Sequence, residues 1–178
     1  MSDKLTPQQR RHCMQQIRSR DTRPEWVVRR FLHSHGFRYR LQVKRLPGKP
    51  DIVMRRLGVC IFINGCFWHG HEGCRYFVIP KTRTAWWTDK FRRNQERDAR
   101  VCQELEALGW RVITVWECEL KPAQRETTLQ RLLTILRRIE APVLVEELRR
   151  TASYANSYSE DDMLIAAEDE EEYSSNNK

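Results

Sequence analysis

The segment from Gly65 to Cys74 reads GCFWHGHEGC and gathers metal-binding side chains in one short stretch. It offers two thiols, Cys66 and Cys74, and two imidazoles, His69 and His71. Thiolates and neutral imidazoles are the ligands of tetrahedral structural zinc sites, which use four of them. A glycine-rich loop has little core of its own, so a bound metal ion would stabilise it. The segment therefore predicts one structural Zn²⁺ ion per chain.

A further zinc ligand has to come from a distant part of the chain. Cys118 follows an apolar run that ends at Trp116. We expect this run to form a strand beside residues 59–63, which would bring Cys118 near the loop. Three thiols and one imidazole then form the site, and the spacing leaves both His69 and His71 eligible as the histidine ligand. The remaining cysteines are scattered, and we interpret them as structural: Cys13, Cys60 and Cys102.

Three carboxylates are candidates for a catalytic Mg²⁺ site. Asp51 opens a β-rich run after Pro50, Asp98 lies in a helical segment, and Glu25 follows a helix-capping threonine. Each also has a purely structural explanation. Asp51 could belong to a turn, Asp98 to a solvated helix face and Glu25 to a helix cap. Together they offer the hard oxygen ligands that Mg²⁺ prefers. The histidine that zinc does not use would serve as the proton-transfer group, so the combination favours hydrolytic chemistry.

Alternating helices and strands would position these residues. Thr22 and Glu25 form a capping box at the start of one helix, and Gly36 provides its stop. Apolar patterning predicts the other elements: a helix over 5–19, a strand over 37–43, a hairpin of strands 51–54 and 59–63, a loop over 64–83, a helix over 84–108, a buried strand over 111–116 and a helix over 123–140. This order predicts one α/β domain, in which helices flank a mixed central sheet.

The charge of the chain is distributed unevenly. Residues 1–150 hold 31 basic and 16 acidic side chains, a net charge of +15, whereas residues 151–178 hold one basic and eight acidic side chains. The basic part indicates a polyanionic partner, with nucleic acid as the first choice and an enzyme with a merely basic surface as the alternative. Ser, Asn, Asp and Glu dominate the acidic tail, which we expect to be disordered.

The hydropathy pattern predicts a soluble, intracellular protein. No stretch approaches ~18 uncharged apolar residues, so we expect no membrane-spanning segment. The first residues, MSDKLTPQQRRHCMQQ, lack the apolar run of a secretory signal. Thiols stay reduced inside cells, which favours metal ligation over disulfide bonds for the clustered cysteines.

Two aromatic pairs, Phe67–Trp68 and Trp86–Trp87, lie in polar surroundings. In DNA-binding proteins, exposed rings can wedge between base pairs and unstack them. We expect Phe67 and Trp68 to point outward from the metal loop. Successive residues on a helix point about 100° apart, so only one of Trp86 and Trp87 should face DNA. The other tryptophans are expected in the core: Trp26, Trp110 and Trp116.

Five sequence blocks carry a resemblance to a known family. They are RDTRPE at 20–25, LPGKPDIV at 46–53, GCFWHGHEGC at 65–74, NQERD at 94–98 and GWRVITVWEC at 109–118. On these blocks, residues 6–120 closely resemble the very-short-patch repair (Vsr) endonucleases. The resemblance implies a variant of the restriction-endonuclease-like PD-(D/E)xK fold. It also implies a bacterial, cytoplasmic, nucleoid-associated DNA repair enzyme that nicks one strand 5′ to the thymine of a G:T mismatch, where 5-methylcytosine has been deaminated.

The resemblance implies a role for each matched position. Catalytic Mg²⁺ would be held by Asp51 and the backbone carbonyl of Ile63, with His69 as the catalytic histidine. Asp98 would be the second catalytic acid, and Glu25 a carboxylate that borders the water shell of the metal. The implied zinc ligands are Cys66, His71, Cys74 and Cys118. The implied DNA-intercalating aromatics are Phe67, Trp68 and Trp86.

The resemblance also divides the chain and names its partners. Residues 1–20 would form a helix that contacts the minor groove, residues 21–150 the endonuclease domain, and residues 151–178 an acidic tail outside the resemblance. The implied partner is double-stranded DNA with a G:T mismatch. Mismatch-repair proteins are further candidates, and action on one strand fits a monomer.

The chain departs from the family pattern at one position, and two alternative functions remain open. Asn64 stands where some family members carry a histidine thought to assist catalysis, so the resemblance implies no second imidazole there. The first alternative is a non-catalytic, zinc-stabilised DNA-binding module. The second is a restriction endonuclease of the same fold, which would cut both strands of fully paired DNA.

Overall fold

The computed structural model describes residues 6–16 and 20–155 of the chain. The described residues divide into two compact units, with the boundary between Thr134 and Ile135. The helices and strands follow in this order: α1 (Pro7–Gln15), α2 (Arg23–Ser34), β1 (Ile52–Met54), η1 (Arg55–Leu57), β2 (Val59–Asn64), α3 (Thr84–Ala107), β3 (Arg111–Trp116), η2 (Glu117–Leu120) and α4 (Pro122–Ala155).

Helix α2 begins and ends where its sequence signals lie. The Thr22 side chain accepts a hydrogen bond from the Glu25 backbone N–H, and the Glu25 carboxylate accepts one from the Thr22 backbone N–H. This reciprocal capping box satisfies donors that the first helical turn leaves free. At the other end Gly36 adopts φ +86°, a left-handed conformation that costs glycine little and ends the helix. Both boundaries were predicted and are confirmed.

The three strands form a mixed sheet with the order β1-β2-β3. Strand β1 pairs antiparallel with β2, with Ile52 opposite Ile61, as the predicted hairpin requires. Strand β2 pairs parallel with β3, and its last residue, Asn64, lies opposite Trp116. Consequently the residue before β1 and the residues after β2 and β3 all lie at one end of the sheet, where the segments that carry Asp51, the metal loop and Cys118 meet.

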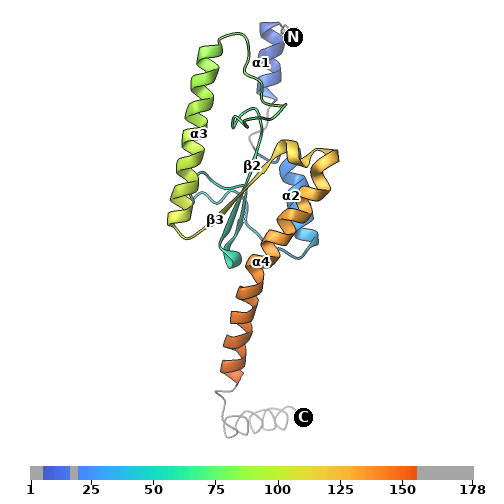
Figure 1. Cartoon of the computed structure of the whole chain (residues 1–178), viewed down its shortest axis with the longest axis vertical. Coiled ribbons are helices and arrows are strands. Elements are labelled where there is room, and N and C mark those ends of the chain that lie inside the picture. Colours follow the sequence, from blue (N-terminus) through green and yellow to red (C-terminus); the bar gives the residue numbers. More distant parts are fainter. Residues whose placement is uncertain (1–5, 17–19, 156–178) are drawn as a thin grey trace, which may run out of the picture. The chain divides into compact units, whose positions relative to one another are not determined.

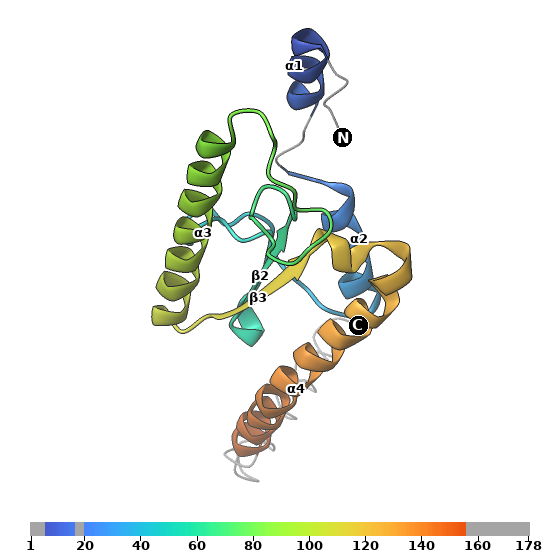
Figure 2. The ribbon, with the colours of Figure 1, turned by 45° about the horizontal axis from the view of Figure 1, so that its top comes forward.

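Helix α3 covers one side of this sheet and α2 lies on the other (Figures 1 and 2). On the α3 side, Val53, Cys60 and Leu105 are buried together, and Val101 and Trp110 pack against them. The neighbours of Val53 in β1 point to the opposite face, because side chains alternate along a strand, and they are also buried. Burial on both faces fixes the register of β1 and therefore the position of the carboxylate that precedes it.

Several predicted boundaries were wrong. Residues 37–43 form no regular strand: Arg40 makes an isolated bridge to Val53, and Gln42 adopts φ +45°, which lies outside the extended conformation of a strand. Strand β3 was expected to be buried, yet only Val115 is, since β3 forms an edge of the sheet. Helix α4 continues through Pro142 to Ala155, because strong helix formers follow the proline.

The two ends of the chain were predicted in part. The first helix spans Pro7–Gln15 rather than 5–19, and residues 1–5 and 17–19 lie outside the described part. The acidic tail was expected to be disordered from residue 151, but residues 151–155 are helical and the rest lies outside the described residues. None of the described helices is long and apolar enough to cross a membrane.

Candidate active site and metal centre

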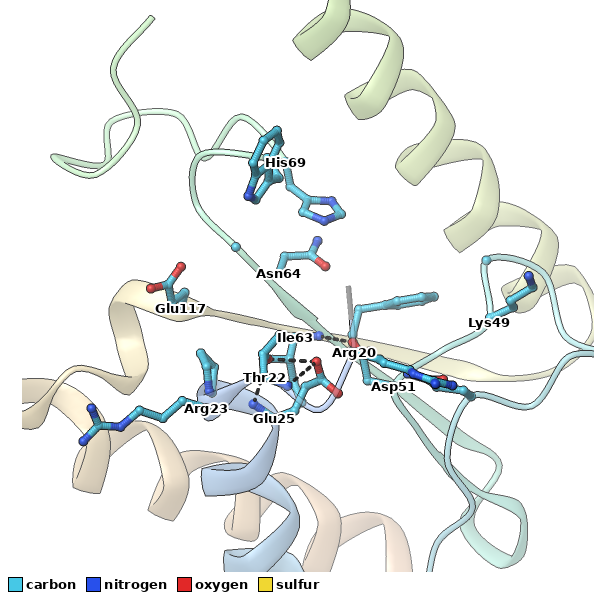
Figure 3. A pocket seen from close by; sticks show the side chains of 16 residues that line it. Arg20, Thr22, Arg23, Glu25, Lys49, Asp51, Ile63, Asn64, His69 and Glu117 are labelled. Carbon is cyan, nitrogen blue, oxygen red and sulfur yellow. Dashed lines mark hydrogen bonds between the residues drawn. The ribbon is translucent and has the colours of Figure 1, made fainter. Parts of the chain in front are cut away.

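A cavity of about 880 Å³ opens at the end of the sheet where β1 begins and β2 ends. Asp51, Glu25 and His69 all line it, although they come from three separate segments. Figure 3 shows Asp51 and Glu25 close together on one wall, with Asn64 and His69 on the wall facing them. The structure thus brings two predicted carboxylates and the predicted catalytic histidine into one space.

Asp51 is held by the strand that pairs with its own. Its Oδ2 accepts a hydrogen bond of 2.8 Å from the backbone N–H of Ile63 in β2. The pKa of Asp51 is raised to about 6, mainly by burial and also by the charge of Glu25, against the lowering effects of the Ile63 N–H, Arg29 and His69. A buried carboxylate that is costly to ionise is suited to binding a cation, which would stabilise its charge.

The raised pKa predicts how stability depends on pH. Between pH 3.8, the ordinary pKa of aspartate, and about pH 6, the folded chain binds a proton that the unfolded chain does not. The free energy of unfolding therefore falls as the pH rises through this window. We expect Asp51→Asn, in protein without added Mg²⁺, to match wild type near pH 4 and to be more stable by about 1–2 kcal/mol at pH 7.5. Urea unfolding of both proteins across this range measures the difference, and a constant difference would contradict the prediction.

Glu25 lies on the cavity wall, but its carboxylate is already fully engaged. Oε1 accepts hydrogen bonds from the N–H and hydroxyl of Thr22, at 3.2 and 2.8 Å. Oε2 accepts from the Asp21 N–H and from Arg29, whose guanidinium also pairs with Asp21 at 2.6 Å. Glu25 and Arg29 are both only 3% exposed. Helix capping and a buried ion pair therefore fix this carboxylate beside Asp51.

His69 is oriented by a carboxylate from α3. Its Nδ1 lies 2.5 Å from Oδ2 of Asp98, whose Oδ1 accepts hydrogen bonds from Arg97. Although burial raises the pKa of Asp98, the hydrogen bonds from His69 and Arg97 lower it below the ordinary value overall. An ionised Asp98 fixes the proton on Nδ1 and leaves Nε2 free to accept a proton. Asp98 is not among the residues that line the cavity of Asp51, and its contact with a lining residue is the one with His69.

We expect Asp98→Asn to reduce the rate of DNA cleavage by about 10²-fold or more, because an amide does not fix the imidazole tautomer as a carboxylate does. Single-turnover rates with saturating enzyme measure this effect without a contribution from binding. Glu96→Gln, on the exposed face of the same helix, is the matched control and should leave the rate unchanged. Equal rates for Asp98→Asn and wild type would show that the His69–Asp98 contact has no role in catalysis.

A second group of side chains forms the candidate metal centre. The ligand atoms of Cys66, His71, Cys74 and Cys118 all lie within 4.8 Å of one another, and Cys118 Sγ is 3.5 Å from His71 Nδ1. Three thiols and one imidazole are a donor set that suits tetrahedral zinc. Burial raises the pKa of Cys66 to about 12, so its thiolate needs a neighbouring cation. The four residues could therefore hold a metal ion such as zinc, with His71 rather than His69 in the cluster.

The loop between β2 and α3 keeps the two histidines apart. Backbone hydrogen bonds within it join His69 to Gly65 and His71 to Cys66. Gly70, between the histidines, adopts φ +62°, and a Cβ there would lie 2.9 Å from the Gln95 side chain. Gln95 also donates to the Gly70 carbonyl at 2.9 Å. A left-handed glycine clamped against α3 thus turns His69 toward the cavity and His71 toward the thiols.

The aromatic residues form a cluster that differs from the prediction. Phe67 packs edge-on against Trp68, Trp87 and Phe91, with ring centroids 5.1–5.3 Å apart. Phe67 and Trp68 are therefore half-buried rather than fully outward. Trp86 is 43% exposed and touches the cluster through Trp87. Trp87, the less exposed of the two, is the ring in contact with Phe67 and Trp68. The choice of Trp86 as the ring that enters DNA stays a prediction.

The three tryptophans assigned to the core have different surroundings. Trp110 packs against the core beside α3, as predicted. Trp116 is half-buried and stacks on the His71 ring, with centroids 4.0 Å apart and an interplanar angle of 5°. Trp26 is 53% exposed, so its assignment was wrong. On α2 it lies away from the face that buries Val28 and Leu32, two and six residues further on.

Comparisons with known proteins identify related enzymes. The model of a family described as DNA mismatch endonuclease Vsr matches residues 2–75. The chain is 52% identical over 120 residues to the type II nicking enzyme V.XorIIP of Xanthomonas oryzae, covering 67% of this chain and 88% of the relative. It is 45% identical over 143 residues to the type II nicking enzyme V.NmeAIP of Neisseria meningitidis, covering 80% and 100%. It is 43% identical over 114 residues to the DNA mismatch endonuclease Vsr of Escherichia coli, covering 64% and 72%.

These findings define the class of the protein. With its mixed sheet between helices and its carboxylate–histidine cavity, the chain is a DNA endonuclease, a hydrolase with a restriction-endonuclease-like fold. It belongs to the Vsr family. Family membership confirms the resemblance seen in the sequence and excludes the non-catalytic DNA-binding module.

Proposed function

We propose that this endonuclease nicks one strand of duplex DNA on the 5′ side of the thymine in a G:T mismatch, and so starts the repair of deaminated 5-methylcytosine. The observation that carries the proposal is the shared cavity of Asp51 and His69, with His69 oriented by Asp98. Support for the mismatch comes from the relative in Escherichia coli, which is named a DNA mismatch endonuclease.

The residues around the cavity fit hydrolysis of a phosphodiester. Asp51 and the Ile63 carbonyl would hold Mg²⁺, which supplies charge neutralisation at the phosphate when bound. Nε2 of His69 accepts a proton from the attacking water as the new oxygen–phosphorus bond forms. The bond from phosphorus to the 3′-oxygen breaks, and that oxygen takes a proton from solvent. Asp98 stabilises the imidazolium that His69 becomes, through the 2.5 Å contact with Nδ1.

The aromatic cluster is the proposed mismatch reader. Phe67, Trp68 and Trp86, the exposed tryptophan of α3, would enter the base stack beside the G:T wobble, at a cost of a few kcal/mol per unstacked step. Lys90 lies over the rings of Trp68 and Trp86, 5.6 and 4.9 Å from their centroids, and would hold them in place before DNA binds. Phe67 and Trp68 directly precede His69 in the sequence. The loop whose rings would enter the DNA at the mismatch would therefore also carry the histidine used in cleavage.

The remaining assignments complete the proposal. Zinc would be bound by Cys66, His71, Cys74 and Cys118 as a structural ion. Residues 1–20 would contact the minor groove beside an endonuclease domain of residues 21–150, with the acidic tail at 151–178. The protein would act as a monomer on chromosomal DNA in the bacterial cytoplasm, with mismatch-repair proteins as candidate partners.

A second candidate is favoured by the names of two relatives. Both are called type II nicking enzymes, so this chain could nick one strand of a fully paired recognition sequence. The deciding experiment uses duplexes that differ only in G:T against G:C, labelled on each strand and incubated with and without Mg²⁺. The proposal predicts one nick, on the thymine strand of the G:T duplex, only with Mg²⁺. A nick in the G:C duplex would favour the second candidate, and a double-strand break would favour a restriction endonuclease.

A further inference from the structure

The mouth of the Asp51 cavity carries three exposed cations, Arg20, Arg23 and Lys49. None of the three has an ion-pair partner among the residues that the structure describes. Some other arginines of the described chain do form ion pairs, for example Arg92 with Asp89 and Arg97 with Asp98. Unpaired cations around a cavity leave their charge available to an anion.

Carboxylates at the cavity do not cancel this charge. Glu25 is paired with the buried Arg29, and Glu117 forms an ion pair of 3.0 Å with Lys121. Among the carboxylates that line the cavity, Asp51 is left with no ion pair to any residue that the structure describes. In Figure 3, Arg23 lies on one side of Asp51 and Glu25, while Arg20 and Lys49 lie on the other. The arrangement is a central acid flanked by cations on both sides.

The backbone at Lys49 adds an independent observation. Lys49 adopts φ +52° directly after Gly48 at φ +66°, so two successive residues are left-handed. A Cβ at Gly48 would lie 2.4 Å from Val101, which shows how closely this turn approaches α3. The left-handed conformation costs a lysine about 1–2 kcal/mol. The Lys49 N–H donates a turn hydrogen bond to the Leu46 carbonyl at 3.2 Å, whereas the exposed side chain forms no hydrogen bond or ion pair with the described residues. Strain of this kind is typical of residues that a functional site requires.

We propose that Arg20, Arg23 and Lys49 form a phosphate clamp, which binds the backbone phosphates on both sides of the scissile phosphate in the nicked strand. The proposal rests on the proposed endonuclease function, since it takes the phosphate beside Asp51 as the one cleaved. Lys49 also lines a second cavity of about 690 Å³ beyond His69, so the clamp extends along the path that the strand would follow. Contacts to one strand only would hold the uncut strand away from Asp51.

The test measures the salt dependence of DNA binding by the full-length protein. Asp51→Asn serves as the non-cleaving background, and Arg20→Gln, Arg23→Gln and Lys49→Gln are added singly. Each lost phosphate contact should reduce the slope of log K against log salt by about 0.9, equally for G:T and G:C duplexes. Between 50 and 200 mM salt, binding by each variant should then weaken about 3.5-fold less than binding by the parent protein.

The matched control is Arg55→Gln, an exposed arginine at the hairpin end of the sheet, away from the cavity. Its slope should stay unchanged, and circular dichroism checks the fold of every variant. A neutral methylphosphonate next to the scissile position should reduce the slope of the parent protein on the nicked strand, but not on the opposite strand. With that modified DNA, the variant that lacks the contact to the same phosphate should have the same slope of log K against log salt as the parent protein.

The outcomes separate the clamp from the mismatch proposal. Unchanged slopes for all three variants, or an equal fall for Arg55→Gln, would overturn the clamp, even if the wild-type chain nicks G:T duplexes. Reduced slopes in a chain that does not nick G:T duplexes would support the clamp and reject the mismatch specificity.

Discussion

His69→Ala and Asp51→Ala are each expected to abolish detectable nicking while binding to DNA survives. His69 supplies the group that accepts a proton from water, a contribution of about 10²–10⁴-fold in rate. Within the described part of the chain, Asp51 is the cavity carboxylate that has no ion pair, so its loss would remove the proposed anchor for a divalent ion. Single-turnover nicking and equilibrium binding, measured on the same G:T duplex, separate the rate of cleavage from affinity.

The control for this experiment is His33→Ala, which removes an exposed histidine from the last turn of α2. It should nick at the wild-type rate. Loss of binding in His69→Ala or Asp51→Ala would contradict the assigned roles, because neither side chain is proposed to provide affinity. Wild-type nicking by either variant would reject the cavity as the active site.

Removing the candidate zinc site is expected to unfold the loop that carries His69. The purified chain should hold one zinc equivalent, and Cys118→Ser should lose both the metal and nicking activity. Structural zinc sites contribute directly to the free energy of folding. Here the metal would join η2 to the loop after β2, which are 44 residues apart between Cys74 and Cys118. Metal analysis and thermal unfolding of the same preparation measure both effects.

Cys102→Ser is the matched control, since Cys102 is a free thiol of α3 outside the cluster. It should keep one zinc equivalent and the wild-type melting temperature. A fully folded protein, recovered after chelation with no metal bound, would show that the cluster does not stabilise the fold through zinc.

Local signals in the sequence predicted much of this architecture. The capping box of Thr22 and Glu25 needs only residues three positions apart, and the β1–β2 hairpin needs only its turn. The parallel pairing of β2 with β3 could also be predicted from the sequence. One apolar run precedes the metal loop, and the other ends two residues before Cys118. The zinc cluster follows from that pairing.

The contacts made by α3 could not be predicted in the same way. Which residue of α3 meets His69 depends on the rotation of the helix against the loop, which tertiary packing fixes. Asp98 was therefore named as a candidate carboxylate for the Mg²⁺ site and as the second catalytic acid, but its contact with His69 was not predicted. The same rotation places Trp87, instead of Trp86, against Phe67. The exposure of Trp26 was not predicted, because a large apolar side chain suggests burial. In the structure, Val28 and Leu32 form the buried face of α2 and Trp26 lies outside it.

Glu25 has two roles, in the cap of α2 and beside Asp51, and this affects how substitutions at position 25 are interpreted. Glu25 caps the first turn of α2 and also lies next to the Asp51 carboxylate. The substitution Glu25→Ala therefore changes both the stability of the helix and the charge near Asp51. Thr22→Val removes half of the same cap and leaves the acid in place. Activity lost in the glutamate variant but kept in the threonine variant would exclude the helix cap as the cause and leave the Arg29 ion pair or the carboxylate beside Asp51. Activity lost in both variants would point to the helix cap.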